Sequence, residues 1–126
     1  MCFTDASVAG HVGPAAISAV FLEGLGHRSE FEALGVSHCS DNNSAELVAV
    51  ASACFLFRTD EARHADELHV FSDSKFVEGV LSSRSHRRQW AFSRDALQWL
   101  LIQLVLLFQL GKRFVLIPLG AWPLRY

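Results

Sequence analysis

The order of apolar segments along this chain limits the folds that it can adopt. The first three segments are short enough to be strands, and glycines lie in both connections between them. Short connections of this kind favour an antiparallel meander. The three expected strands span residues 1–6, 15–22 and 31–39.

Helices and strands are expected to alternate in the rest of the chain. Residues 44–58 place apolar side chains at helical spacing, and residues 68–72 form an apolar run that suits a strand covered on both faces. The later elements are helices over 44–58, 74–81 and 93–110 and strands over 68–72 and 114–117. This order predicts an α/β fold, in which a mixed five-stranded sheet has three antiparallel strands, then strands parallel to the first, and is flanked by helices.

Residues 96–110 contain no charged side chain and are the most apolar segment of the chain. A membrane-spanning helix needs about 20 apolar residues. This segment is shorter and includes three glutamines, so we prefer a helix buried against the sheet and expect no membrane partner. A membrane-associated or interaction module built on 96–110 is the alternative from another functional class.

The composition indicates one folded domain over residues 1–126. The length suits a single core, and 51% hydrophobic against 19% charged residues argues against disorder. A net charge of -2 argues against a protein held to nucleic acid by bulk charge alone, although a local basic patch could still bind. The cysteines form no CxxC pair, which indicates reduced thiols in an intracellular compartment and no zinc site.

Three acidic residues fall where neighbouring elements are expected to meet. Asp5 lies in the first strand, and Asp73 directly follows the strand over 68–72. If these strands are parallel neighbours, their backbones lie about 4.8 Å apart and the two carboxylates stand side by side. Glu46, in the first turn of the helix after the meander, can complete the cluster. Crowded carboxylates repel one another, so we expect them to hold a divalent cation such as magnesium.

The segments around these acids resemble a known family. They read FTDAS at 3–7, NNSAEL at 42–47 and FSDS at 71–74, with Gly10, Gly13 and Pro14 after the first. In this order they resemble ribonuclease H of type 1. The resemblance covers nearly the whole chain and looks closest to the domain found in retroelement polyproteins.

The resemblance implies an endoribonuclease that hydrolyses the RNA strand of RNA–DNA hybrids by two-metal-ion catalysis. It implies two Mg²⁺ ions, with Mn²⁺ as a substitute, and suggests a place within a larger polyprotein. Asp5, Glu46 and Asp73 match three of the family's four metal-binding catalytic acids. Glu46 is also explained as half of a capping box, in which it would bond back to the start of its own helix.

Further residues are candidates for contacts with nucleic acid. Asn42 and Asn43 match positions that, in the family, contact the minor groove of the hybrid. Ser74 matches a polar residue next to the third acid that also approaches the substrate. Both asparagines are equally explained as turn residues. Arg87 and Arg88 belong to a basic cluster with an aromatic residue, which could hold phosphates or could simply be a solvated loop.

The chain departs from the family's pattern at several positions. Ala6 stands where the family usually has glycine, and His11-Val12 where it often has Asn-Pro. No histidine follows His86 and no acidic residue follows Asp95, so the family's loop histidine and the last helix with the fourth aspartate have no match. These departures suggest a domain truncated at the C-terminus and clipped at the N-terminus. They make a catalytically impaired hybrid-binding domain the alternative within nucleic-acid biology.

Overall fold

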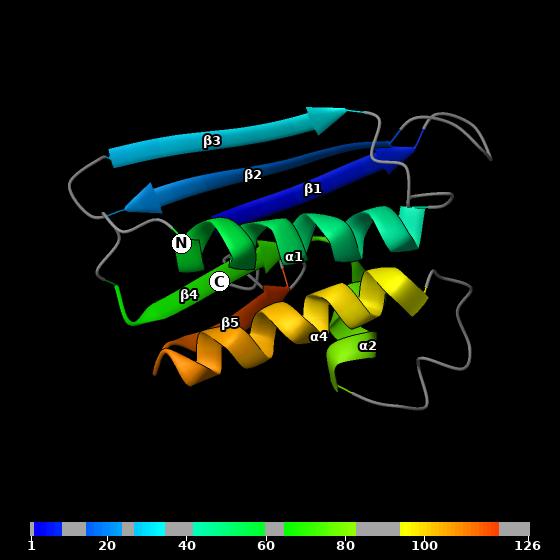
Figure 1. Ribbon diagram of the computed structural model, residues 1–126. Helices are drawn as coiled ribbons and strands as arrows, with labels where there is room; N and C mark the ends of the chain where they lie inside the picture. The colour runs from blue at the N-terminus through cyan, green and yellow to red at the C-terminus, as the bar shows by residue number, and fades with distance from the viewer. Residues whose placement is uncertain are drawn as a thin grey trace, which may run out of the picture.

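The computed structural model describes residues 2–8, 15–23, 27–34, 42–59, 65–82 and 94–118 (Figure 1). The first three elements are the strands β1 (Cys2–Val8), β2 (Ala15–Glu23) and β3 (His27–Leu34). They are followed by α1 (Asn42–Thr59), β4 (Glu67–Ser72), α2 (Lys75–Ser82), α4 (Arg94–Gln109) and β5 (Arg113–Pro118).

The strands of the described residues form one mixed sheet in the order β3-β2-β1-β4-β5. β2 pairs antiparallel with both β1 and β3, whereas β4 pairs parallel with both β1 and β5. β1 therefore lies at the centre of the sheet, where its antiparallel and parallel halves meet (Figure 1). The α/β class that the sequence predicts is the class that the structure has.

The third strand differs from its predicted position. We expected residues 31–39, but β3 begins at His27 and ends at Leu34. Its pairing with β2 starts at the Glu23–His27 pair and continues through polar residues. β3 is an edge strand, so backbone hydrogen bonds to β2 can define it without an apolar face. A search for apolar runs therefore misplaced it. Residues 35–39 lie outside the described part of the chain.

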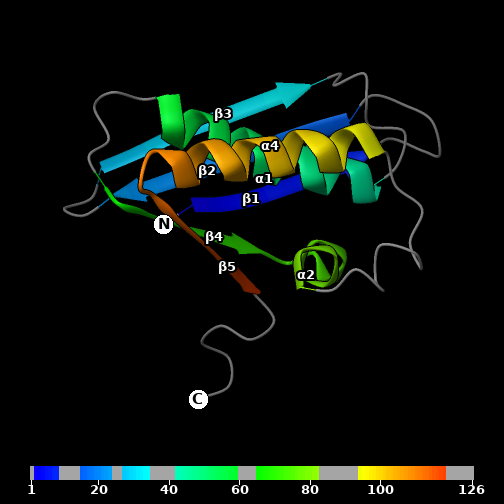
Figure 2. The same cartoon turned by 60° about the horizontal axis from the view of Figure 1, so that its bottom comes forward.

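α1 is the central helix of the fold. It packs against β1 and β2 on one side and against α4 on the other, and α1 and α4 share one face of the sheet (Figures 1 and 2). Because α1 is covered on both sides, its buried residues are not confined to a single stripe of the helix. Its buried apolar side chains are Ala45, Leu47, Val48, Ala49, Val50, Ala51, Ala53, Cys54 and Phe57.

α4 turns one face inward and ends in a defined motif. Its buried side chains recur at helical spacing and are Ala96, Leu100, Gln103 and Leu107. Gly111 has a φ of 73°, its N–H donates to the Phe108 carbonyl at 2.9 Å, and the Lys112 N–H donates to the Leu107 carbonyl at 3.1 Å. This pair of bonds is a Schellman motif, a common C-terminal end of a helix. Among the described residues, no helix combines the length and apolarity needed to cross a membrane.

A buried polar contact joins the two central helices. The Gln103 side chain of α4 is buried, and its Oε1 accepts hydrogen bonds from Arg58 of α1 at 3.1 Å from Nη2 and 3.4 Å from Nε. The Arg58 guanidinium also lies 5.4 Å from the ring centre of Phe55. A polar group in this interface costs less free energy when it is hydrogen-bonded, and the contact fixes one register between α1 and α4.

Candidate functional site

The backbone register brings Asp5 and Asp73 to neighbouring positions. β1 and β4 pair in parallel, and Phe3 lies opposite Phe71. Asp5 is two residues beyond Phe3, and Asp73 is two residues beyond Phe71, so both occupy the same alternate positions of adjacent strands. Asp5 is within β1, where its backbone pairs with Ser18, and Asp73 directly follows β4. The expected adjacency of these two strands is therefore present, although the Asp5 side chain itself lies outside what the structure describes.

α1 begins at the same end of the sheet. β1 and β4 point toward the end at which the first turn of α1 lies (Figure 1). Glu46 is half-buried there, and its Oε2 atom is shielded from solvent. The helix starts at Asn42, and no acidic residue lies in its first turn. The first-turn position and the capping-box interpretation of Glu46 are therefore wrong, because the helix begins earlier than expected.

The connection after β4 is held by two serine hydroxyls. The Ser72 Oγ accepts a hydrogen bond from the Ser74 N–H at 3.2 Å, and the Ser74 Oγ accepts one from the Val77 N–H at 3.2 Å. Ser74 is thus the N-cap of α2, a role that the sequence interpretation did not assign to it. These bonds fix the backbone on both sides of Asp73, whose side chain is exposed to solvent.

The other predicted contact residues are described to different extents. Asn42 and Asn43 are the first two residues of α1 rather than turn residues, and the Asn43 side chain is half-buried. Arg87 and Arg88 lie outside the described residues. Among the side chains that the structure describes, no three His, Cys, Asp or Glu residues form a group that could hold a metal ion. The described side chains do not include that of Asp5. Convergence of the three acids therefore remains a prediction.

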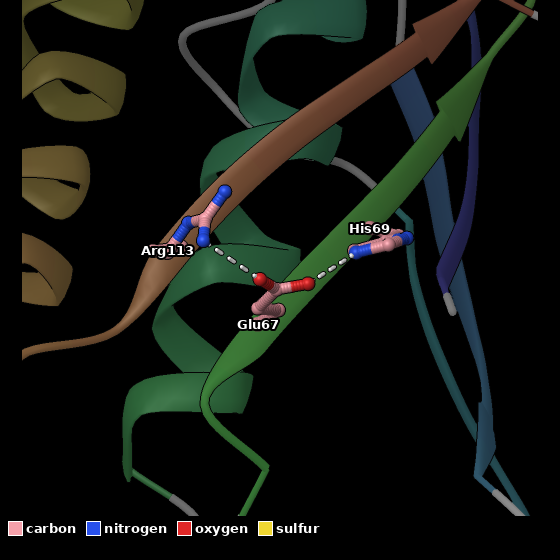
Figure 3. A network of polar contacts seen from close by, with 3 residues as sticks. All are labelled: Glu67, His69 and Arg113. Atoms are coloured by element: carbon pink, nitrogen blue, oxygen red, sulfur yellow. Dashed lines mark hydrogen bonds and ion pairs between the residues drawn. The ribbon is translucent and has the colours of Figure 1, made fainter.

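A separate ionic network lies at the opposite end of β4. Glu67 Oε2 is 3.0 Å from His69 Nε2, and Glu67 Oε1 is 3.2 Å from Arg113 Nη1 of β5 (Figure 3). The hydrogen bond from His69 and the charge of Arg113 lower the pKa of Glu67. Sequence reasoning missed this network, because it depends on the parallel register that places Glu67 beside Arg113. Glu67 and Asp73 are separated by the length of the strand, about 20 Å, so the network is not part of the acidic site.

A mixed sheet in which β2 runs antiparallel to β1 and β4 runs parallel to it, with α1 and α4 on one face, is the arrangement of ribonuclease H-like α/β proteins. The sequence matches the RNase H family over residues 1–116. The chain therefore belongs to the RNase H family.

Solved structures show the same fold. RNase H1 from Halobacterium salinarum is 23% identical with a TM-score of 0.56, and the match covers 94% of this chain and 85% of that one. The N-terminal RNase H domain of Rv2228c from Mycobacterium tuberculosis, solved as a fusion with maltose binding protein, is 21% identical with a TM-score of 0.59, covering 95% and 84%. LC11-RNase H1, isolated from compost by a metagenomic approach and solved with an RNA/DNA hybrid, is 22% identical with a TM-score of 0.57, covering 93% and 83%. No curated protein matches this chain.

Proposed function

We propose that this chain binds RNA–DNA hybrids and hydrolyses their RNA strand, with Asp5, Glu46 and Asp73 as the catalytic residues. The observation that carries the proposal is the parallel pairing of β1 with β4, in which Phe3 lies opposite Phe71, two residues before Asp5 and Asp73, at the sheet end where α1 begins. Membership of the RNase H family supports the reaction class. The LC11-RNase H1 structure with a hybrid supports the substrate class, because its fold is that of this chain.

The chemistry of the three side chains suits a divalent cation. All three supply carboxylate oxygens, which are the ligands that Mg²⁺ prefers and that Mn²⁺ also accepts. When bound, a pair of such ions activates the attacking water and stabilises the leaving oxygen. Asp73 is exposed and can reach both a cation and a substrate, whereas Glu46 is half-buried and less free to move.

The protein itself supplies position and charge. The serine bonds on either side of Asp73 restrict its backbone, and β1 holds Asp5 within the sheet, so neither residue lies on a long loop. Rigid positioning of this kind lowers the barrier, because the groups need not be ordered during the reaction. We assign contacts with the hybrid to Asn42, Asn43 and Ser74.

A second candidate function is hybrid binding with impaired cleavage. It applies if Asp5, Glu46 and Asp73 are the sole anionic ligands of the cations. A cation pair held by three carboxylates has fewer anionic ligands than one held by four. Weak binding of one ion would raise the activation barrier by several kcal/mol, which slows the reaction roughly a thousandfold. Cleavage that is slow with Mg²⁺ and faster with Mn²⁺ would identify this case.

The function is tested with a labelled hybrid and three control nucleic acids of the same sequence. The 126-residue chain should shorten only the RNA strand of the hybrid, and only when a divalent cation is present. Duplex DNA, duplex RNA and single-stranded RNA should remain intact. Equal cleavage of single-stranded RNA, or cleavage that continues with excess chelator, would contradict the proposal.

Binding of the hybrid can be tested separately from its cleavage. Replacing Arg87 and Arg88 together with alanine should weaken hybrid binding and reduce the slope of log affinity against log salt by up to about two, because each lost phosphate contact releases about one counterion fewer. Exchanging both arginines for lysines is the matched control, since it keeps the charge. An unchanged slope in the double alanine variant would show that these arginines contact no phosphate.

A further inference from the structure

Thr4 of β1 has a buried hydroxyl group without a hydrogen-bond partner among the described residues. Its side chain is 4% exposed, and its Oγ1 atom is shielded from solvent. It lies on the α1 side of the sheet, as Cys2 does two residues earlier, and its backbone partner in β2 is the buried Ala19. A buried hydroxyl without a hydrogen bond costs free energy, so Thr4 indicates a partner that the protein chain does not supply.

Ser72 of β4 brings a second buried hydroxyl to the neighbouring position. The last backbone pair of the parallel strands β1 and β4 is Phe3–Phe71, and Thr4 and Ser72 are the next residue of each strand. Their side chains therefore lie on the same, buried face of the sheet, and that of Ser72 is 2% exposed. The Ser72 Oγ accepts a hydrogen bond from the Ser74 N–H, and its own proton can serve as a donor.

The separation of the two strands suits one water molecule between these hydroxyls. Neighbouring strands lie about 4.8 Å apart, and no hydrogen bond joins Thr4 directly to Ser72. A water bonded to both oxygens spans about 4.5–5 Å, because each O–H···O bond is about 2.7–2.8 Å long. Each hydroxyl can donate to the water or accept from it, so the water has the polar partners that a buried site requires.

We infer that Thr4 and Ser72 hold one buried water molecule and that this bridge positions the two aspartates. Asp5 directly follows Thr4, and Asp73 directly follows Ser72. The bridge therefore joins β1 to β4 one residue beyond their last backbone pair and one residue before each acid. Because it limits how far the strands can separate there, it fixes the distance between the two acids along the sheet. The positioning role rests on the proposed function, whereas the water site does not.

A crystal structure of the cation-free chain tests the water site. It should contain an ordered water within hydrogen-bond reach of both Thr4 Oγ1 and Ser72 Oγ, and a Thr4→Val crystal should lack that water. A direct bond between the two hydroxyls, or a Thr4 hydroxyl bonded to another protein group, would overturn the inference. No cation takes part in this measurement, so its result does not depend on the proposed function.

Thermal unfolding tests whether the two hydroxyls act together. Thr4→Val keeps the shape of the side chain but removes its hydroxyl, and it should lower Tm by a few degrees because the bridge is lost. In a Ser72→Ala background the same change should lower Tm much less, because the bridge is already absent. A higher Tm in Thr4→Val, or an equal loss in both backgrounds, would show that the Thr4 hydroxyl binds nothing.

Calorimetric titration with Mn²⁺ tests the positioning role. Thr4→Val should weaken binding about tenfold, whereas Thr4→Ser, which keeps the hydroxyl and loses the methyl group, should bind like wild type. Val70→Ala is the matched control, because Val70 is buried in β4 two residues before Ser72 and its truncation lowers stability without removing a hydroxyl.

Three results would contradict the positioning role. Unchanged affinity in Thr4→Val would show that the hydroxyl does not act on the acids. Equal weakening in Thr4→Val, Thr4→Ser and Val70→Ala would show that lost stability, not the hydroxyl, lowers the affinity. A wild type that binds no Mn²⁺ would overturn the proposed function together with the positioning role, and the water site would still be decided by the crystal structure.

Discussion

At the scale of single residues, two buried groups are explained by their surroundings. Gln103 is tolerated in the α1–α4 interface because Arg58 donates to its side-chain oxygen. Cys54 has a raised pKa because burial disfavours the thiolate, and Cys2 adds a smaller effect in the same direction. Cys54 lies in the segment 44–58, whose apolar side chains recur at helical spacing, and it is buried in α1. The Arg58–Gln103 contact could not be predicted, because it joins residues that only the packing of two helices brings together.

Substitutions at Gln103 should separate the hydrogen bond from the space that the side chain fills. Gln103→Ala removes both and should lower the free energy of unfolding by about 2–3 kcal/mol. Gln103→Leu keeps most of the side-chain volume. Because Arg58 is only half-buried and can turn to water, Gln103→Leu should lower the free energy of unfolding by about 1 kcal/mol or less. Urea unfolding measures both values. Equal losses in the two variants would mean that the hydrogen bond, not the packing, is decisive.

Cys54 should make the protein less stable at alkaline pH. The unfolded thiol ionises near its ordinary pKa of about 8.5, whereas the folded thiol, with its raised pKa, stays protonated. Below that pH the group has no effect on pH dependence; above it, the free energy of unfolding should fall by up to about 1.4 kcal/mol per pH unit. Cys54→Ala should reduce this slope between pH 9 and pH 10.5, roughly the window above the ordinary pKa. An identical slope in wild type and variant would contradict the assignment.

At the scale of elements, apolar patterning located most of the described helices and strands and misplaced β3. α1, β4 and α4 were found within two residues of their observed ends, because each buries apolar side chains at a regular spacing. β3 was misplaced because residues 27–30 are polar, so no apolar pattern marks where the strand begins, and its backbone pairing with β2 defines it. The role of Ser74 was missed because an N-cap is recognised by where its helix starts, and α2 begins at Lys75, one residue later than expected.

The C-terminal stop of α4 gives a prediction about conformation alone. Gly111 has a positive φ, and a Cβ added there would meet no other atom within 4 Å. Gly111→Ala should therefore cost roughly 1 kcal/mol of stability through backbone strain, without any clash. Gly111→Asn should cost less, because asparagine adopts this conformation more readily. Thermal unfolding of the three proteins tests the order, and an alanine variant as stable as wild type would contradict it.

At the scale of the whole molecule, the sheet topology makes the candidate site. Three segments far apart in the sequence reach one end of the sheet, because β1 and β4 are parallel neighbours and α1 begins beside them. The sequence could identify the three acids by their place after strands and near a helix start. It could not establish that β1 pairs with β4, since that pairing depends on how the meander and the later α/β segment pack together.

Titration of the chain with Mn²⁺ by calorimetry tests most directly whether Asp5, Glu46 and Asp73 form one cation site. Wild type should bind the ion, and Asp5→Asn and Asp73→Asn should each weaken binding about tenfold or more, because each removes an anionic ligand. Asp66→Asn is the matched control: Asp66 is exposed just before β4, at the opposite end of the strand, and its loss should leave affinity unchanged. Binding that is equally strong in Asp5→Asn and wild type would contradict the shared site.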